Sequence, residues 1–325
     1  MVNSLTRAVL IDTDTASDDA VALSMALRSS SVEVKAITVV AGNMPVEQGA
    51  RNALYTLELC DSEAPVFVGA GKPLVRELEI ADWFHGSDGL GDQGYSPQRR
   101  SVEREHAVDA IIRTVKATPG IEIITLGPLT NVALALGREP GIAGSVSRCV
   151  VMGGAPCCEG NVTPAAEYNI WVDPEAAEAV FRSGLPIEMV GWQLCRGPAI
   201  LGMDDIAKLK GFGTPLAEFA VRANSTAMRA HQTQTGDIGI SLPDPVAMGI
   251  LLDPSLCLNS SPHYVMIETE SALTRGMTVV DRLNVAHDAR NRRVWSNALG
   301  RGVQAQVCWQ LDTPRWRTLL FEALR

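Results

Sequence analysis

Four aspartates crowd into eight residues near the start of the chain: Asp12, Asp14, Asp18 and Asp19. They follow an apolar run at residues 9–11, typical of a β-strand, and precede one at residues 20–27, typical of a helix. Carboxylates this close repel one another, so the folded chain needs a cation, protons or hydrogen-bond donors among them. Ca²⁺ or Mg²⁺, which prefer oxygen ligands, would suit such a site. Helix capping by Ser17 or Asp18 is the alternative, and it would account for one or two of the four acids.

More polar groups stand where later apolar runs end. Asn43 follows the run at 34–40, Leu126 opens a polar stretch after the run at 121–126, and Met152 precedes two glycines. Pro128 lacks an amide hydrogen, so one carbonyl near it loses its usual partner. The carboxyl ends of parallel strands meet at one edge of a sheet, where ligands bind. These groups are therefore expected to converge on one pocket.

The segment at 159–170 is irregular and carries Asn161, Glu167 and Asn169, which could bind the hydroxyls of a sugar. A surface loop that uses these side chains in its own turns is the alternative. Asp244 precedes a proline at a helix start, an ordinary N-cap position. Together with the N-terminal acids, it could also supply a further ligand.

Short β-branched runs alternate with longer amphipathic ones, which predicts βαβ units around a largely parallel sheet. We expect one α/β domain over residues 1–325, with loops at 76–102 and 230–242 that serve as mobile binding loops. The expected strands are 8–12, 34–40, 64–68, 121–126, 148–152, 187–191, 264–268 and 304–310. The expected helices are 19–29, 46–60, 103–118, 129–138, 174–183, 204–209, 215–228, 244–252 and 314–324.

Composition narrows the class of protein. The chain is 46% hydrophobic and 20% charged, as a globular protein is, and its net charge of −9 argues against a nucleic-acid partner. No apolar run approaches the roughly 20 residues that span a bilayer. The spacing of the seven cysteines fits neither a zinc site nor a disulfide framework. With no signal-peptide pattern at the start, we expect a cytoplasmic protein with reduced thiols.

These motifs together resemble the nucleoside hydrolase family, also called inosine–uridine preferring nucleoside hydrolases. The resemblance spans nearly the whole chain, and the matching segments are 12–14 with 18–19, 42–43, 85–86 with 89–90, 126–131, 151–154, 160–161 with 167–169, 173–177 and 244–245. It implies a Rossmann-like, open and mostly parallel sheet flanked by helices, a tightly held Ca²⁺ and a homodimer or homotetramer. It also implies hydrolysis of the N-glycosidic bond of ribonucleosides to ribose and free nucleobase.

The resemblance also implies roles for the acids. Asp14 is expected to bind calcium and to act as general base toward the metal-bound water. Asp19 and the Leu126 carbonyl are further calcium ligands, and Asp244 binds both the metal and a ribose hydroxyl. Asp12 is expected to orient the others.

The side chains at the remaining positions of the family pattern are expected to contact the sugar. The side chains expected to hold the 2′- and 3′-hydroxyls are Asp18, Asn43 and Asn169. Those expected to surround the 5′-hydroxyl are Asn161, Glu167 and Met152.

One position departs from the family pattern. Many members have a histidine, which helps the nucleobase leave, where this chain has Pro243. His85 and His231 are the candidates to replace it, since histidine suits proton transfer near neutral pH. Trp83, with Phe84, could stack on the base. Plain packing is the alternative for these aromatic residues, and a solvated loop position is the alternative for each histidine.

Two other functions compete with hydrolysis. The sequence at 12–15 imitates the nucleophile motif of haloacid-dehalogenase-type phosphatases, although that interpretation leaves Asp18 and Asp19 without a role. A ribose- or nucleoside-binding protein of the same fold, with little turnover, is the second alternative. Pro243 is the reason to consider it.

Overall fold

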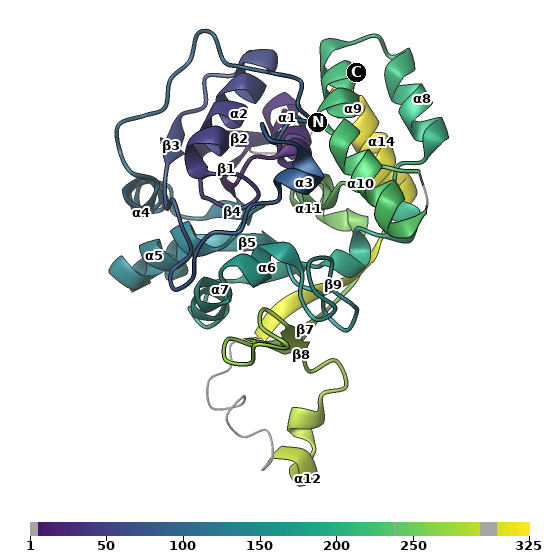
Figure 1. The fold of residues 1–325 in the computed structure, drawn as a ribbon. Helices are drawn as coiled ribbons and strands as arrows, with labels where there is room; N and C mark the ends of the chain where they lie inside the picture. The colour runs from purple at the N-terminus through teal and green to yellow at the C-terminus, as the bar shows by residue number, and fades with distance from the viewer. Residues whose placement is uncertain (1–5, 237, 293–303) are drawn as a thin grey trace, which may run out of the picture.

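A nine-stranded sheet forms the centre of the computed structural model, which describes residues 6–236, 238–292 and 304–325 (Figure 1). In order across the sheet, the strands are β3 (Val66–Val68), β2 (Val32–Val39), β1 (Arg7–Thr13), β4 (Ile121–Thr125), β5 (Val146–Met152), β6 (Ile187–Val190), β9 (Gln304–Leu311), β7 (Cys257–Ile267) and β8 (Thr278–Val280). The first seven run parallel, whereas β7 is antiparallel to both β9 and β8. The predicted α/β fold with a mostly parallel sheet is confirmed.

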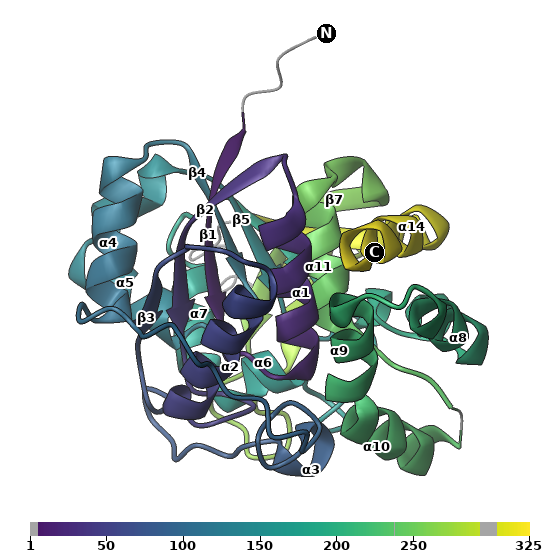
Figure 2. The ribbon, with the colours of Figure 1, turned by 90° about the horizontal axis from the view of Figure 1, so that it is seen from above.

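Helices cover both faces of the sheet. The helices are α1 (Ser17–Arg28), α2 (Val46–Leu59), α3 (Asp82–His85), α4 (Ala107–Ala117), α5 (Thr130–Arg138), α6 (Tyr168–Val172), α7 (Pro174–Phe181), α8 (Met203–Gly211), α9 (Pro215–Ala223), α10 (Ser225–Thr235), α11 (Pro243–Leu252), α12 (Ala289–Arg292) and α14 (Thr313–Leu324). Figure 2 shows α4 and α5 on one side of the strands and α1, α11 and α14 on the other. Within the described residues, no helix is long and apolar enough to cross a membrane.

Strand β1 illustrates why the sheet is central. Val9, Leu10 and Ile11 are fully buried, since alternate side chains point into two different apolar clusters. Val9 and Ile11 pack toward α1, α2 and α11, and Leu10 packs toward α4 and α5. Burial on both faces is typical of a parallel strand covered by helices. The strand order reverses between β2 and β4 around β1, so the residues after β1 stand at the switch point where such sheets bind ligands.

Several expected boundaries are wrong. The helix expected at 215–228 is two helices, α9 and α10, separated at Asn224, whose side chain donates to the Ala220 carbonyl at 2.9 Å. The loop expected at 230–242 is helical up to Thr235, and residue 237 lies outside the described residues. The loop expected at 76–102 contains α3.

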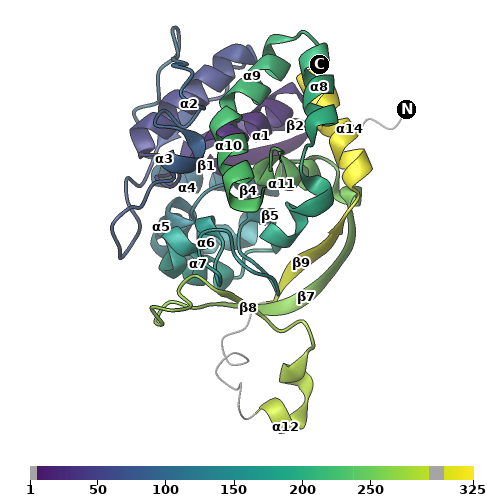
Figure 3. The ribbon, with the colours of Figure 1, turned by 45° about the vertical axis from the view of Figure 1, so that its right-hand side comes forward.

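The last part of the sheet also differs from expectation. Strand β7 has 11 residues instead of the expected 264–268, because its polar first half pairs with β9. Figure 3 shows these two long strands side by side at the edge of the body. Tertiary pairing decides the extent of such a strand, since its local sequence carries no alternation of apolar and polar residues.

Candidate active site

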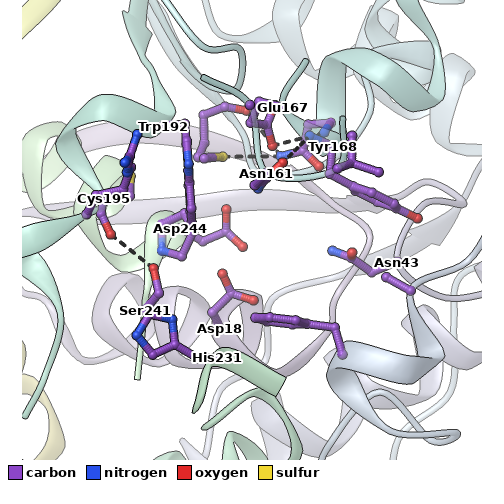
Figure 4. Close-up of a pocket in the computed structure, with 18 of the residues that line it drawn as sticks. Asp18, Asn43, Asn161, Glu167, Tyr168, Trp192, Cys195, His231, Ser241 and Asp244 are labelled. Atoms are coloured by element: carbon purple, nitrogen blue, oxygen red, sulfur yellow. Dashed lines mark hydrogen bonds between the residues drawn. The ribbon is translucent and has the colours of Figure 1, made fainter. Parts of the chain in front are cut away.

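Four of the acids meet beyond the carboxyl end of β1. Asp14 follows that strand, Asp18 and Asp19 lie in the first turn of α1, and Asp244 lies in the first turn of α11. All four are buried, and carboxylate oxygens of Asp18, Asp19 and Asp244 lie within 4.8 Å of one another. Figure 4 shows Asp18 and Asp244 pointing toward one another in the middle of a pocket. The fold thus joins acids that are 230 residues apart in sequence, between positions 14 and 244.

Local hydrogen bonds fix two of these acids. The Asn43 amide donates to Asp14 Oδ2 at 2.5 Å. Asp19 accepts from the Thr13 hydroxyl at 2.5 Å and from the Ala16 amide at 2.9 Å. Ala16 is the N-cap residue of α1, so the capping alternative for Ser17 and Asp18 is wrong. Asp244 likewise lies inside the first turn of α11, after its N-cap residue, and does not cap it.

Other oxygens of the cluster have no hydrogen-bond partner in the part of the chain that the structure describes. Asp14 Oδ1 and Asp18 Oδ1 are buried without a hydrogen bond from any described residue. Burial, followed by repulsion from Asp19, raises the pKa of Asp14 well above its usual value and that of Asp18 to about 7. The pKa of Asp244 is raised well above its usual value for the same two reasons. Unpaired buried carboxylates cost free energy unless a cation or protons compensate them.

The residues present fit a hard cation. The donors are carboxylates and a backbone carbonyl, the ligand types that Ca²⁺ prefers. Space beside Asp14 exists only because two neighbours are glycines: an added Cβ would lie 2.1 Å from Asp14 Oδ2 at Gly42 and 2.9 Å from Asp14 Oδ1 at Gly127. The Leu126 carbonyl accepts from Asn169 Nδ2 at 2.9 Å, and Leu126 borders the cavity that Asp18 and Asp244 line.

Asp12 lies outside this group. It is fully buried at the end of β1, where its Oδ1 accepts from the Thr38 hydroxyl at 2.6 Å and from Asn131 Nδ2 at 2.9 Å. Burial raises its pKa to about 7, and these two hydrogen bonds oppose that shift. The signal for this partnership was present in the sequence, because Asn131 belongs to the polar stretch after β4.

The residues expected to bind the sugar line a cavity of roughly 470 Å³, and two of the four acids, Asp18 and Asp244, border it. Asn169 Nδ2 approaches Met152 Sδ at 3.2 Å, and Glu167 accepts from the Gly154 amide at 2.7 Å. Asn161 Oδ1 accepts from the Tyr168 amide at 2.9 Å. All the expected sugar contacts border this cavity: Asp18, Asn43, Met152, Asn161, Glu167, Asn169 and Asp244. Several of them also stabilise the loop and helix α6, as the alternative for this segment expects, and their contact with a sugar stays a prediction.

The candidates near the nucleobase lie on α3 and α10 and border the same cavity. His85 is buried, with Nδ1 2.8 Å from the Ser17 hydroxyl and 3.9 Å from Asp18 Oδ1. Burial lowers the pKa of His85 to about 3, so its imidazole is neutral at pH 7. His231 is partly buried, and its Nε2 has no hydrogen bond from a described residue. Trp83 is exposed at the cavity.

Sequence reasoning missed several residues of this cavity. The Tyr168 hydroxyl lies 2.9 Å from the Gly42 carbonyl and 2.6 Å from the Glu79 carbonyl, and it can donate to one of them at a time. Trp192 follows β6, and the end of that strand was the available signal. Ser241 donates to the Cys195 carbonyl at 3.0 Å, as Figure 4 shows.

Comparison with known proteins places the chain in a family. The model of the inosine-uridine preferring nucleoside hydrolases matches residues 9–317, which decides against the haloacid-dehalogenase alternative. A pyrimidine-specific ribonucleoside hydrolase, RihA, of Salmonella typhimurium is 40% identical over 276 residues, covering 84% of this chain and 88% of that protein.

Solved structures agree with this family. A plant nucleoside hydrolase, PpNRh1, superposes with a TM-score of 0.91 at 33% identity, covering 98% of this chain and 99% of its own. A purine-preferring ribonucleoside hydrolase from Gardnerella vaginalis gives 0.86 at 30% identity, covering 98% of both chains. The chain therefore belongs to the inosine-uridine preferring nucleoside hydrolase family and is an enzyme of that family.

Proposed function

We propose that the protein hydrolyses the N-glycosidic bond of ribonucleosides to ribose and free nucleobase, with Asp14 as general base and Ca²⁺ as its cofactor. One observation carries the proposal. Asp14 Oδ1 and Asp18 Oδ1 are buried without hydrogen-bond partners among the described residues, and Asp18 borders a cavity lined by groups that can bind a sugar. Such costly groups are typical of a site whose ligands complete it.

Calcium would be held by the carboxylates of Asp14, Asp19 and Asp244 and by the Leu126 carbonyl. When bound, it would keep these acids ionised, lower the pKa of a water and supply positive charge for binding the ribose hydroxyls. The all-oxygen set of ligands supports a hard cation over a soft one.

The side chains of the protein then have separate roles in the reaction. Asp14 takes the proton of the attacking water through Oδ1. Asp18, Asn43 and Asn169 bind the 2′- and 3′-hydroxyls of the ribose. The positive charge of the oxocarbenium-like transition state develops on the sugar, and the surrounding carboxylates stabilise it.

The other end of the ribose is held by groups on the 159–170 segment. Glu167 and Asn161 border the cavity beside Met152, and they bind the 5′-hydroxyl. The hydrogen bonds that Glu167 accepts from the Gly154 and Asn169 amides keep its carboxylate in place for this contact. A fixed ribose brings the glycosidic carbon into position for attack.

Departure of the base requires a group other than Pro243. His85 serves as a neutral hydrogen-bond donor from Nε2, with its Nδ1 turned toward Ser17. His231 is the second group on this side of the cavity, and Trp83 packs against the base. The name of the relative RihA supports pyrimidine nucleosides as the first substrates to test.

The test is a panel of purine and pyrimidine ribonucleosides assayed for free reducing sugar, with and without a chelator. We expect release of ribose from at least one nucleoside, loss of activity on prolonged chelation, and recovery with calcium. Tight nucleoside binding by calorimetry with no ribose after long incubation would favour the binding protein of the same fold, for which Pro243 is the motive. Light scattering of the same sample tests the expected homodimer or homotetramer.

A further inference from the structure

Three side chains of types that can bind a metal meet outside the active site, on the neighbouring strands β6, β9 and β7. Glu188 lies on β6, Cys308 on β9 and Cys257 at the start of β7. One ligand atom from each lies within 4.8 Å of the other two. Strand β9 pairs with both β6 and β7, and Figure 3 shows β7 and β9 running side by side. None of the three borders the active-site cavity.

The spacing of these atoms suits a tetrahedral cation. Cys308 Sγ lies 3.4 Å from Glu188 Oε1. With Zn–S bonds of about 2.3 Å and Zn–O bonds of about 2.0 Å, a tetrahedral site separates sulfur from oxygen by about 3.5 Å. A cation could therefore join these two atoms with almost no movement, and Cys257 Sγ, which lies within 4.8 Å of both, would have to shift by at most about 1.3 Å.

Arg148 orients the Glu188 carboxylate for metal binding. Its Nε donates to Glu188 Oε2 at 2.6 Å, and its other nitrogens donate to the carbonyls of Ile250 and Leu251 at 3.0 and 3.2 Å. This arrangement turns Oε1 toward the two thiols, in the way that outer hydrogen bonds orient metal-binding carboxylates. Two thiolates, one carboxylate, one guanidinium and a divalent cation sum to zero charge, so the partly buried site would carry no net charge.

Burial sets how the cation reaches the site. Cys308 is buried, whereas Cys257 and Glu188 are partly exposed, so solvent can deliver the ion and a water can complete four ligands. Thiolates select soft cations such as Zn²⁺, in contrast to the oxygen ligands of the aspartate cluster. We propose that Cys257, Cys308 and Glu188 form a second cation site, which binds Zn²⁺ or a similar thiophilic ion and ties β6, β7 and β9 together.

The test uses cobalt as a spectroscopic probe. Full-length protein is kept reduced, freed of metal with a chelator and saturated with calcium, and Co²⁺ is then added. We expect one thiolate-bound Co²⁺ per chain, seen as a sulfur-to-cobalt absorption band that Zn²⁺ abolishes. Cys257→Ser and Cys308→Ser should lose the band, and Glu188→Gln should weaken Co²⁺ binding at least about tenfold.

Two controls separate this site from others. Cys60→Ser removes a partly buried thiol elsewhere and should keep the band. Asp14→Asn should also keep it, which distinguishes this site from the aspartate cluster. Zn²⁺ should raise the Tm of the wild type but not of Cys257→Ser, whose ribonucleoside hydrolysis should be unchanged.

A wild type without a thiolate band at one equivalent of Co²⁺ would overturn the proposal. A band of full intensity in Cys257→Ser would do the same. Cys257 is partly exposed at the start of β7, so this variant gives the answer even where Cys308→Ser fails to fold.

Discussion

Asp12 allows the electrostatics of the site to be tested without touching a proposed ligand. Its carboxyl group is fully buried, and burial raises its pKa to about 7. Because the pKa in the folded state exceeds that in the unfolded chain, the folded protein holds a proton that the unfolded chain releases. The stability from this proton is complete below pH about 4 and is lost as the pH rises through about 7.

The expected change follows from this shift. Between pH 6 and pH 8, Asp12 should lower the free energy of unfolding by about 1 kcal/mol, and Asp18, whose pKa is also raised to about 7, should act in the same direction by a similar amount. His85 acts in the opposite direction, because burial lowers its pKa to about 3. It should raise the free energy of unfolding by about 1 kcal/mol over the same pH range. The net loss without calcium is about 1 kcal/mol or more. Asp14 and Asp244, whose pKa values are raised well above the usual value, add to the loss.

The assay is urea unfolding at pH 6, 7 and 8 in the presence of a chelator, for the wild type and for Asp12→Asn. The asparagine keeps the oxygen that accepts from Thr38 and Asn131 but cannot titrate. Its loss between pH 6 and pH 8 should be smaller than that of the wild type by about 1 kcal/mol. Equal pH dependence of the two proteins would refute the reasoning. Calcium should flatten the wild-type curve, because it favours the ionised acids around it.

Three further substitutions test the site. Gly42→Ala should lower kcat at least about tenfold with an unchanged circular dichroism spectrum, because the new Cβ would lie 2.1 Å from Asp14 Oδ2; full activity would contradict this close approach. His85→Ala should lower kcat at least about tenfold on an unactivated nucleoside but spare p-nitrophenyl riboside, and equal losses on both would exclude a leaving-group role. Ser17→Ala should show the same pattern more weakly and Ser17→Thr should restore activity, since the hydroxyl lies 2.8 Å from His85 Nδ1; a loss that Thr does not rescue would argue for a purely structural role.

Much of the fold could be predicted because the pattern of apolar residues in the sequence agrees with their burial in the structure. The apolar residues of β1 form a short continuous run, as a strand buried on both faces requires, and the acids after it mark the ligand-binding edge. The break at Asn224 could not be predicted, because the Asn224 side chain bonds to the Ser17 carbonyl, far away in sequence, at 3.2 Å. The first half of β7 was missed for the same reason, since its pairing with β9 decides it.

The candidate site also contains some residues that the sequence predicted and others that it did not. The crowding of Asp14, Asp18 and Asp19 in the sequence predicts an acidic site. The structure brings Asp244 close to Asp18 and Asp19. Ser17 suggested a helix cap, whereas its hydroxyl contacts His85. A contact between residues on separate elements depends on how α1 and α3 pack, and neither segment carries a signal for it alone. The same is true of Cys257 and Cys308, whose spacing along the chain suggests no shared site.

The role of Asp14 as general base is tested by the turnover of Asp14→Asn on the best nucleoside substrate, with calcium saturating. Loss of a general base should lower kcat by about 10²–10⁴-fold, with ribonucleoside binding still detectable by calorimetry. An Asp14→Asn enzyme that releases ribose at the wild-type rate would contradict the account.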